Sequence, residues 1–117
     1  MTSKLKTGEE GEQMAAEFLI SKGFEIIARN FRHKRSEIDL IVKRGNWLVF
    51  VEVKTRSSAA FGFPEQFVDY HKKKMIFEGA LHYMREIDWQ GNVRYDIVSV
   101  SLSSAGPDIV HIEDAFY

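Results

Sequence analysis

Two carboxylates and a lysine that could cleave a phosphodiester lie in the stretch S-E-I-D-L-I-V-K-R-G-N-W-L-V-F-V-E-V-K-T-R, residues 36–56. Hard divalent cations such as Mg²⁺ bind oxygen ligands, commonly one or two carboxylates completed by water and phosphate oxygens. Asp39 and Glu52 supply two carboxylates, and the backbone carbonyl of Val53 is a candidate third oxygen. Lys54 is placed to hold an attacking water or to offset charge on the phosphate. Metal-assisted phosphodiester hydrolysis requires these groups.

A β-hairpin would bring these side chains together. Two apolar runs flank Gly45-Asn46, a dipeptide suited to a two-residue turn with Gly first. In that register facing residues have numbers that sum to 91, so Asp39 faces Glu52 and Glu37 faces Lys54. Because side chains alternate between the faces of a strand, all four project from one face. Directly opposed like charges repel, which predicts a cation between the two acids.

The same residues also have a purely structural interpretation as a set of ion pairs. Glu37 with Lys54, and Glu52 with a nearby Arg or Lys, would form exposed pairs that contribute about 0 to 1 kcal/mol and carry no function. The pairing of Asp39 with Glu52 favours a functional site, since an ion-pair network has to neutralise two adjacent acids. Whether Lys54 is catalytic or paired with Glu37 decides between the two hypotheses.

Composition predicts one domain spanning residues 1–117, because 117 residues with 44% hydrophobic content can bury one core but not two. The chain has no cysteine, which excludes disulfides and thiolate metal sites. The first ten residues contain no apolar signal segment, and no run is long enough to span a membrane. We therefore expect a cytosolic protein with no membrane partner.

Charge is segregated along the chain although the net charge is only −1. Residues 29–74 hold eleven Lys and Arg against five acids, whereas the flanking thirds are both acidic. A basic region around a carboxylate cluster fits a polyanionic partner that also needs a metal, although ordinary solvated charges are an even alternative. The candidate nucleic-acid-binding residues in this region are Arg32, Lys34, Arg35, Arg56, Lys72 and Lys73.

The elements expected to position these groups follow from periodicity and turn residues. A helix is predicted from Thr7, with Glu10 completing a capping box and Gly23 ending it. The remaining prediction is a strand at 24–29, a basic connection at 30–35, the hairpin, a loop at 55–64, a helix at 65–86, and strands at 93–101 and 109–113. This order predicts an α/β fold with a mixed central sheet flanked by helices.

Two segments of this pattern carry a family resemblance. E-I-D-L-I at 37–41 and F-V-E-V-K-T-R at 50–56 resemble the PD-(D/E)xK nuclease superfamily. With G-E-E-G-E at 8–12 and A-R-N-F at 28–31, the chain resembles the YraN-like uncharacterised bacterial family, which is similar to archaeal Holliday junction resolvases. The chain departs from the superfamily pattern at Ile38 and Ser36. The resemblance implies a restriction-endonuclease-like α-β-β-β-α-β core.

The resemblance also implies roles for single residues. Asp39, Glu52 and Lys54 match the nuclease signature, and Glu12 matches a helix-borne acid that completes the metal site. Taken alone, Glu12 is equally well explained as a first-turn glutamate favoured by the helix dipole. Lys72 matches a basic position on the second helix, toward the phosphate. The implied protein is a metal-dependent endonuclease for branched DNA that uses Mg²⁺ or Mn²⁺, with no organic cofactor, and a homodimer.

Two rival functions remain open from the sequence. One is a nucleic-acid-binding module that keeps the nuclease fold without turnover. The other is a protein-interaction subunit that docks a partner through Glu113, Asp114 and the aromatic pair Phe116-Tyr117. The four histidines lack the paired spacing of metal ligands, which predicts surface roles for them.

Overall fold

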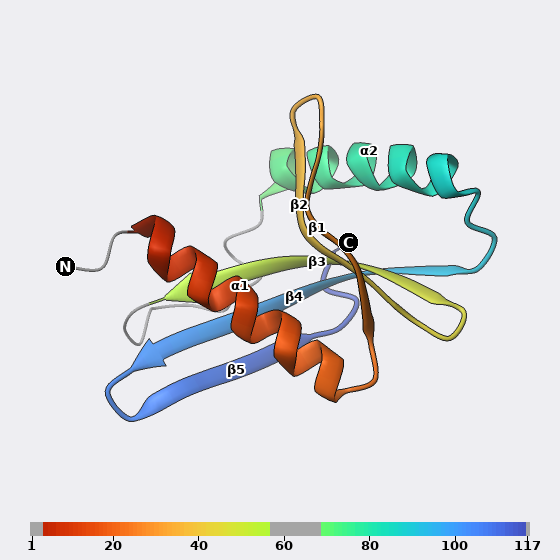
Figure 1. The fold of residues 1–117 in the computed structure, drawn as a ribbon. Helices are drawn as coiled ribbons and strands as arrows, with labels where there is room; N and C mark the ends of the chain where they lie inside the picture. The colour runs from red at the N-terminus through yellow and green to blue at the C-terminus, as the bar shows by residue number, and fades with distance from the viewer. Residues whose placement is uncertain (1–3, 57–68, 117) are drawn as a thin grey trace.

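The computed structural model describes residues 4–56 and 69–116, which form two helices and one five-stranded sheet (Figure 1). The elements in chain order are α1 (Lys4–Ser21), β1 (Glu25–His33), β2 (Ser36–Arg44), β3 (Trp47–Arg56), α2 (Tyr70–Ile87), β4 (Asn92–Ser103) and β5 (Gly106–Ile112). The predicted α/β class and the α-β-β-β-α-β order are confirmed. Neither helix is long and apolar enough to cross a membrane among the residues described.

The sheet has the strand order β1-β2-β3-β4-β5. Strands β3 and β4 are parallel and joined through α2, whereas the other neighbouring pairs are antiparallel. The predicted hairpin register is confirmed from Leu40 opposite Val51 to Arg44 opposite Trp47. Gly45 has a φ of 59°, in the left-handed region that glycine adopts without steric cost.

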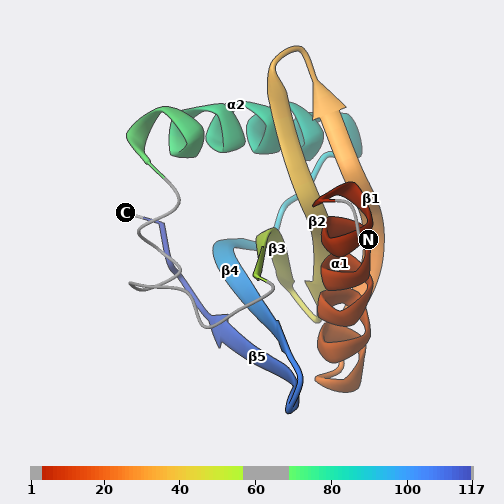
Figure 2. The same ribbon diagram turned by 90° about the vertical axis from the view of Figure 1, so that its left-hand side faces the viewer.

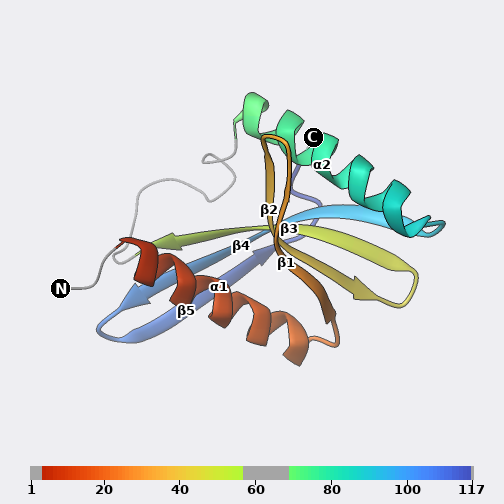
Figure 3. The same cartoon turned by 45° about the horizontal axis from the view of Figure 1, so that its top comes forward.

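The two helices cover opposite faces of the sheet (Figures 1 and 3). Ala15 and Leu19 of α1 pack on the face that presents Val49 and Val51 of β3. Ile76 and Ala80 of α2 pack with Phe50 on the other face. Because side chains alternate along β3, Glu52 and Lys54 share the face of Phe50 and point toward the α2 side. Figure 2 shows the β1–β2 hairpin extending past the other strands and crossing α2.

Three predicted boundaries were wrong. The first helix begins at Lys4 rather than Thr7, so Thr7 and Glu10 lie inside the helix rather than at its start. The connection predicted at 30–35 is largely strand, since β1 continues to His33 and only Lys34 and Arg35 form the turn. Arg56 is still in β3, and residues 57–68, with the predicted second-helix start, lie outside the described residues.

The C-terminal segment is part of the core rather than a docking tail. The backbone N–H of Ala115 donates to the carbonyl of Tyr95 at 2.8 Å. Phe116 is buried and stacks on Tyr95 with ring centroids 5.9 Å apart. A partner therefore cannot use Phe116 without unpacking this segment, and Tyr117 lies outside the described residues.

Candidate active site

The site lies where the β2–β3 ladder ends. Beyond the Leu40–Val51 pair, Asp39 is not paired directly with Glu52 as the register alone predicts. Instead the Asp39 carboxylate bends toward the next residue of β3, and Val53 N–H donates to its Oδ2 at 2.8 Å. Because β2 no longer pairs with β3 at this point, the Asp39 side chain replaces β2 as the acceptor for the Val53 N–H. The bond also holds Asp39 beside Glu52.

Glu52 is the centre of a charge cluster. Its side chain is 5% exposed, and its Oε1 lies 2.5 Å from Nζ of Lys72 and 3.5 Å from Nζ of Lys54. Lys72 reaches Glu52 from the first turn of α2, where the Asp69 side chain caps the helix by accepting from the Lys72 N–H at 2.8 Å. The sequence placed Lys72 as a phosphate or DNA contact, and the ion-pair interpretation expected a nearby Arg or Lys at Glu52 without identifying it as Lys72.

Glu37 does not compete for Lys54. It sits opposite Arg32 in the β1–β2 ladder and pairs with that residue at 3.3 Å, with both side chains well exposed. The predicted Glu37–Lys54 pair was wrong because β2 and β3 separate before reaching these positions. Arg32 is therefore engaged in a surface ion pair, which contributes little to stability.

Glu12 approaches the cluster from α1. A Cβ at the preceding Gly11 would lie 2.6 Å from Cγ2 and 2.8 Å from Cβ of Thr55, so only glycine lets the helix lie this close to the end of β3. The Asn30 side chain, from a residue with a φ of 51°, hydrogen-bonds Glu12. Asparagine tolerates that left-handed conformation better than most residues. Asn30 was not predicted as a site residue.

Two of the acids, Asp39 and Glu12, have raised pKa values. Burial raises the pKa of Asp39 to about 7, and the negative charges of Glu52 and Glu12 add to the effect. Burial also raises the pKa of Glu12, again with the charge of Glu52. A nearby positive charge would favour the ionised form of both Asp39 and Glu12.

The pKa values of Lys54 and Lys72 are shifted in opposite directions. Burial lowers the pKa of Lys54, and contact with Lys72 lowers it further against the attraction of Glu52. Burial acts to lower the pKa of Lys72 as well, but its hydrogen bond to Glu52 and the charge of that residue outweigh burial and leave the pKa raised. The surroundings therefore favour the charged form of Lys72 more strongly than that of Lys54.

The donor set fits a hard divalent cation that keeps most of its own ligands. Within residues 4–56 and 69–116, no group of three or more His, Asp and Glu side chains is close enough together to hold a metal ion unaided. Asp39 and Glu52 would hold Mg²⁺ or Mn²⁺ only with water and substrate oxygens completing the shell, which is the usual mode for Mg²⁺. Glu12 acts on this pair through its charge and is too far for a closed three-carboxylate cage.

The remaining predicted DNA-binding residues are spread over two places. Arg35 and Lys34 lie at the β1–β2 turn beside α2, where Arg35 lines two pockets and Lys34 lines one of them. Lys73 is on the first turn of α2, and Arg56 is half-buried at the end of β3. The structure thus brings Arg35 and Lys72 to one pocket, of which Arg56 is not a lining residue.

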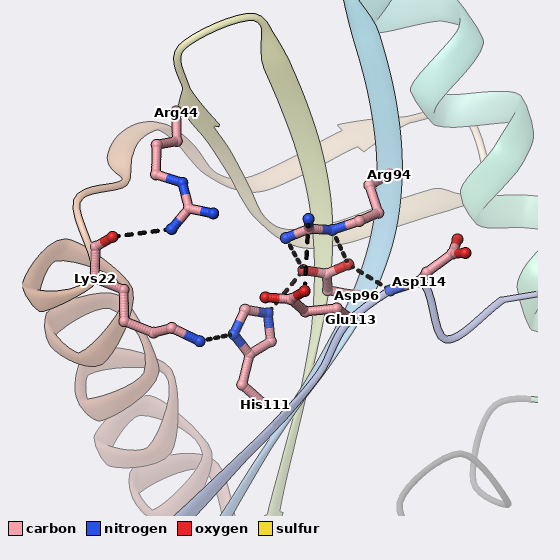
Figure 4. A network of polar contacts seen from close by, with 7 residues as sticks. All are labelled: Lys22, Arg44, Arg94, Asp96, His111, Glu113 and Asp114. Atoms are coloured by element: carbon pink, nitrogen blue, oxygen red, sulfur yellow. Dashed lines mark hydrogen bonds and ion pairs between the residues drawn. The ribbon is translucent and has the colours of Figure 1, made fainter.

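A second polar network, which the sequence did not predict, lies on the α1 face of the sheet (Figure 4). Asp96 of β4 is fully buried and accepts hydrogen bonds from Nε and Nη2 of Arg94 at 2.9 and 3.0 Å. His111 Nε2 lies 2.7 Å from Asp96 Oδ2, and its Nδ1 lies 2.8 Å from Nζ of Lys22. The N–H of Asp114 completes the set at 3.0 Å.

This network corrects the expectation that every histidine is a surface residue. The His111 side chain is 3% exposed and joins β4, β5 and the end of α1. Burial acts to raise the pKa of Asp96, but the bonds from His111 and Arg94 outweigh burial and hold the pKa below its usual value. A lone Asp in an apolar strand was the one available signal, since a buried carboxylate needs partners.

The protein is of the α/β class, with a mixed five-stranded sheet covered by one helix on each face. The carboxylates and lysines of the candidate site lie at the end of the β2–β3 hairpin. The chain belongs to the Uncharacterised protein family UPF0102, whose model matches residues 11–100. This confirms the resemblance to the YraN-like family. The matched segment includes Glu12, Asp39, Glu52 and Lys54.

Relatives of similar length come from distant bacteria. A UPF0102 protein of Christiangramia forsetii is 39% identical over 117 residues, covering 100% of this chain and 98% of the relative. One of Syntrophus aciditrophicus is 42% identical, covering 99% and 92%. Among solved structures, SfsA of Pyrococcus furiosus in complex with Ca²⁺ aligns at a TM-score of 0.41 and 14% identity, covering 92% of this chain and 62% of SfsA.

Proposed function

We propose that this protein is a metal-dependent endonuclease that hydrolyses phosphodiester bonds in DNA, with branched DNA as its preferred substrate. The observation that carries the proposal is the convergence of Asp39 and Glu52 with two lysines at one strand end. The resemblance of E-I-D-L-I and V-E-V-K to the PD-(D/E)xK nuclease signature supports the same chemistry. A homodimer is part of the proposal, because a resolvase acts on two symmetric strands.

The roles follow from the contacts. Asp39 and Glu52 would hold Mg²⁺ or Mn²⁺, which when bound polarises a phosphate oxygen and acidifies a water. Lys54, whose pKa is lowered, would orient that water, and Glu12 would add negative charge that strengthens cation binding. Lys72, which pairs with Glu52, would be displaced from that carboxylate by a bound cation and would then be free to contact the phosphate.

Cleavage of branched and single-stranded DNA in the presence of Mg²⁺ or Mn²⁺ tests the proposal. Asp39→Ala and Glu52→Ala are expected to abolish cleavage while Glu25→Ala, an exposed acid at the start of β1, leaves it unchanged. Activity that survives both site substitutions would rule the assignment out. Sedimentation that shows only monomer at micromolar concentration would contradict the dimer.

A non-catalytic DNA-binding module is the second candidate, and the Glu52–Lys72 contact favours it. An ammonium 2.5 Å from the carboxylate already neutralises Glu52 without any metal. This function predicts salt-sensitive DNA binding that is indifferent to divalent cations and survives Asp39→Ala. Calorimetric titration with Mn²⁺ separates the two candidates, since the module gives no heat of metal binding.

A further inference from the structure

Two pockets lie along the line where the β1–β2 turn meets α2. One, of about 400 Å³, is lined by His33, Lys34, Arg35, Ser36, Met75 and Glu78. The other, of about 310 Å³, is lined by Arg35, Glu37, Asp69, His71, Lys72, Met75 and Ile76. We call the two together the hairpin groove. They share Arg35 and Met75, and Lys72 connects the second pocket to Glu52 of the candidate active site.

The groove is a fixed feature of the fold. Ser36 Oγ donates to the carbonyl of Met75 at 2.6 Å, which joins the start of β2 to α2 at the boundary between the pockets. A Cβ at Gly79 would lie 2.7 Å from Cβ of Ser36, so glycine at this position allows the helix and the hairpin to touch. The spacing between the two walls is therefore set by direct contact rather than by long side chains.

The two pockets are lined by both basic and acidic side chains, whereas a simple phosphate site has basic ones alone. Arg35 and Lys34 supply positive charge for a sugar-phosphate chain, whereas Lys72 is paired with Glu52. Glu78 and Glu37 would repel phosphate, but a carboxylate accepts hydrogen bonds from the exocyclic amines of bases. The combination fits a ligand that carries both an anionic backbone and amino groups.

An imidazole adds a stacking surface. The rings of His33 and His82 are stacked with centroids 3.5 Å apart and planes 10° apart. One face of the His33 ring is thus covered by His82, which holds the ring in place in the pocket wall. Aromatic rings held in this way bind unstacked bases, and a base inside a duplex has neither face open.

We propose that the hairpin groove binds an unpaired nucleotide of the DNA next to the phosphate that the candidate active site engages. Arg35 contacts its phosphate, His33 stacks on its base, and Glu78 accepts from its amine. This inference rests on the proposed function and narrows it: the substrate is a junction between duplex and single strand rather than continuous duplex.

The test measures binding in EDTA, so that metal chemistry plays no part. Fluorescence anisotropy compares a labelled duplex with the same duplex carrying a short single-stranded tail that contains 2-aminopurine. The wild type is expected to bind the tailed DNA about tenfold more tightly, the effect of one base stacked on a protein ring. The 2-aminopurine emission should change on binding, which reports stacking directly.

Substitutions locate the effect. His33→Ala and Glu78→Gln are expected to remove most of the preference for the tail and to leave duplex affinity nearly unchanged. Lys74→Gln, an exposed position on α2 outside both pockets, and Glu25→Gln are the matched controls and keep the preference. Circular dichroism confirms that His33→Ala is folded, and Glu78→Gln carries the test if it is not.

The outcomes separate this inference from the function on which it rests. Equal affinity of the wild type for the two DNAs would contradict nucleotide binding in the hairpin groove and would leave the endonuclease proposal unaffected. A tail preference that survives both groove substitutions would also contradict nucleotide binding in the groove. Failure to bind either DNA removes the groove and the DNA-directed function together.

Discussion

Asp39 carries an unfavourable charge in the folded protein, because its pKa is raised to about 7 by burial and by the acids beside it. A carboxyl with a raised folded-state pKa binds more protons folded than unfolded, so its contribution to stability is favourable below pH 4 and is lost as pH rises through about 7. A group that costs stability at neutral pH is typical of a functional site.

We predict that Asp39→Asn stabilises the protein at pH 8 by about 2 to 4 kcal/mol, since the amide oxygen still accepts from Val53 N–H and no charge is buried. The gain should vanish near pH 4, where the wild-type carboxyl is protonated in the folded state. Urea unfolding at both pH values measures the difference. A gain independent of pH would mean that charge is not its cause.

Lys72 and Lys54 can be separated by comparing stability with cleavage. Lys72→Met removes the cation 2.5 Å from buried Glu52, and we expect it to lower the free energy of unfolding by about 1 to 3 kcal/mol. Lys54→Met removes the more distant partner at 3.5 Å and should cost less stability. Lys73→Met, the neighbouring lysine on α2, is the control.

For DNA cleavage in saturating Mn²⁺, Lys54→Met should be the more damaging of the two lysine substitutions. Lys54→Met is expected to lower the rate by at least about 10²-fold, the cost of losing one group that stabilises the reacting centre, while Lys72→Met lowers it less. Single-turnover cleavage measures both. If Lys72→Met is the more damaging of the two, the roles assigned to the lysines are exchanged.

At the scale of elements, the position of α1 depends on Gly11. Its hypothetical Cβ comes within 2.8 Å of the Thr55 Cβ, whereas nothing lies within 4 Å of a Cβ at Gly8, one turn earlier. Both glycines lie inside the helix, so alanine improves helix propensity by about 1 kcal/mol at either site. Of the two positions, only Gly11 lies against β3, where an added Cβ would clash with Thr55.

Gly11→Ala is therefore expected to destabilise the protein by about 1 to 3 kcal/mol through overpacking, and Gly8→Ala to be neutral or stabilising. Thermal unfolding measures the contrast. In a Thr55→Gly background the obstructing side chain is gone. The double variant Gly11→Ala/Thr55→Gly should therefore be at least as stable as Thr55→Gly alone. Equal effects at the two glycines would show that α1 can shift without cost.

The elements themselves were largely predictable from the sequence, and the contacts between their ends were not. The Gly45-Asn46 turn fixed the register of β2 and β3, because a one-residue slip would move every apolar side chain to the wrong face. Register says nothing of where a ladder stops, so the separation of the strands at Asp39 was missed. An ion pair at Glu52 was expected, but Lys72 was not identified as its partner, since that contact depends on how α2 returns across the sheet.

At the scale of the whole molecule, charged clusters sit on the two faces of one sheet. Glu52 and Lys72 lie on the α2 face, and Asp96 with its partners lies on the α1 face. The first cluster leaves a charge that costs stability, whereas in the second every partner favours the ionised form of Asp96. The second cluster also joins distant parts of the chain, from Lys22 to Asp114.

We predict that Asp96→Asn lowers the free energy of unfolding at pH 7 by about 3 to 5 kcal/mol, because it leaves Arg94 and His111 facing a neutral group in the interior. The folded-state pKa of Asp96 is lowered, so its stabilisation is complete above the unfolded pKa and is lost as pH falls through the lower folded value. The wild type should therefore lose stability below about pH 4 relative to Asp96→Asn. Asp108→Asn, an exposed acid on β5, is the control.

Urea unfolding from pH 3 to pH 8 measures both the size of the loss and its pH dependence. Hydrogen exchange adds the spatial test: in Asp96→Asn the amides of β5 and of the last turn of α1 should lose protection together, because His111 joins Asp96 to Lys22. Amides of the β2–β3 hairpin should stay protected, since its register does not depend on this network. Loss of protection confined to β5 would show that Asp96 secures only the edge of the sheet.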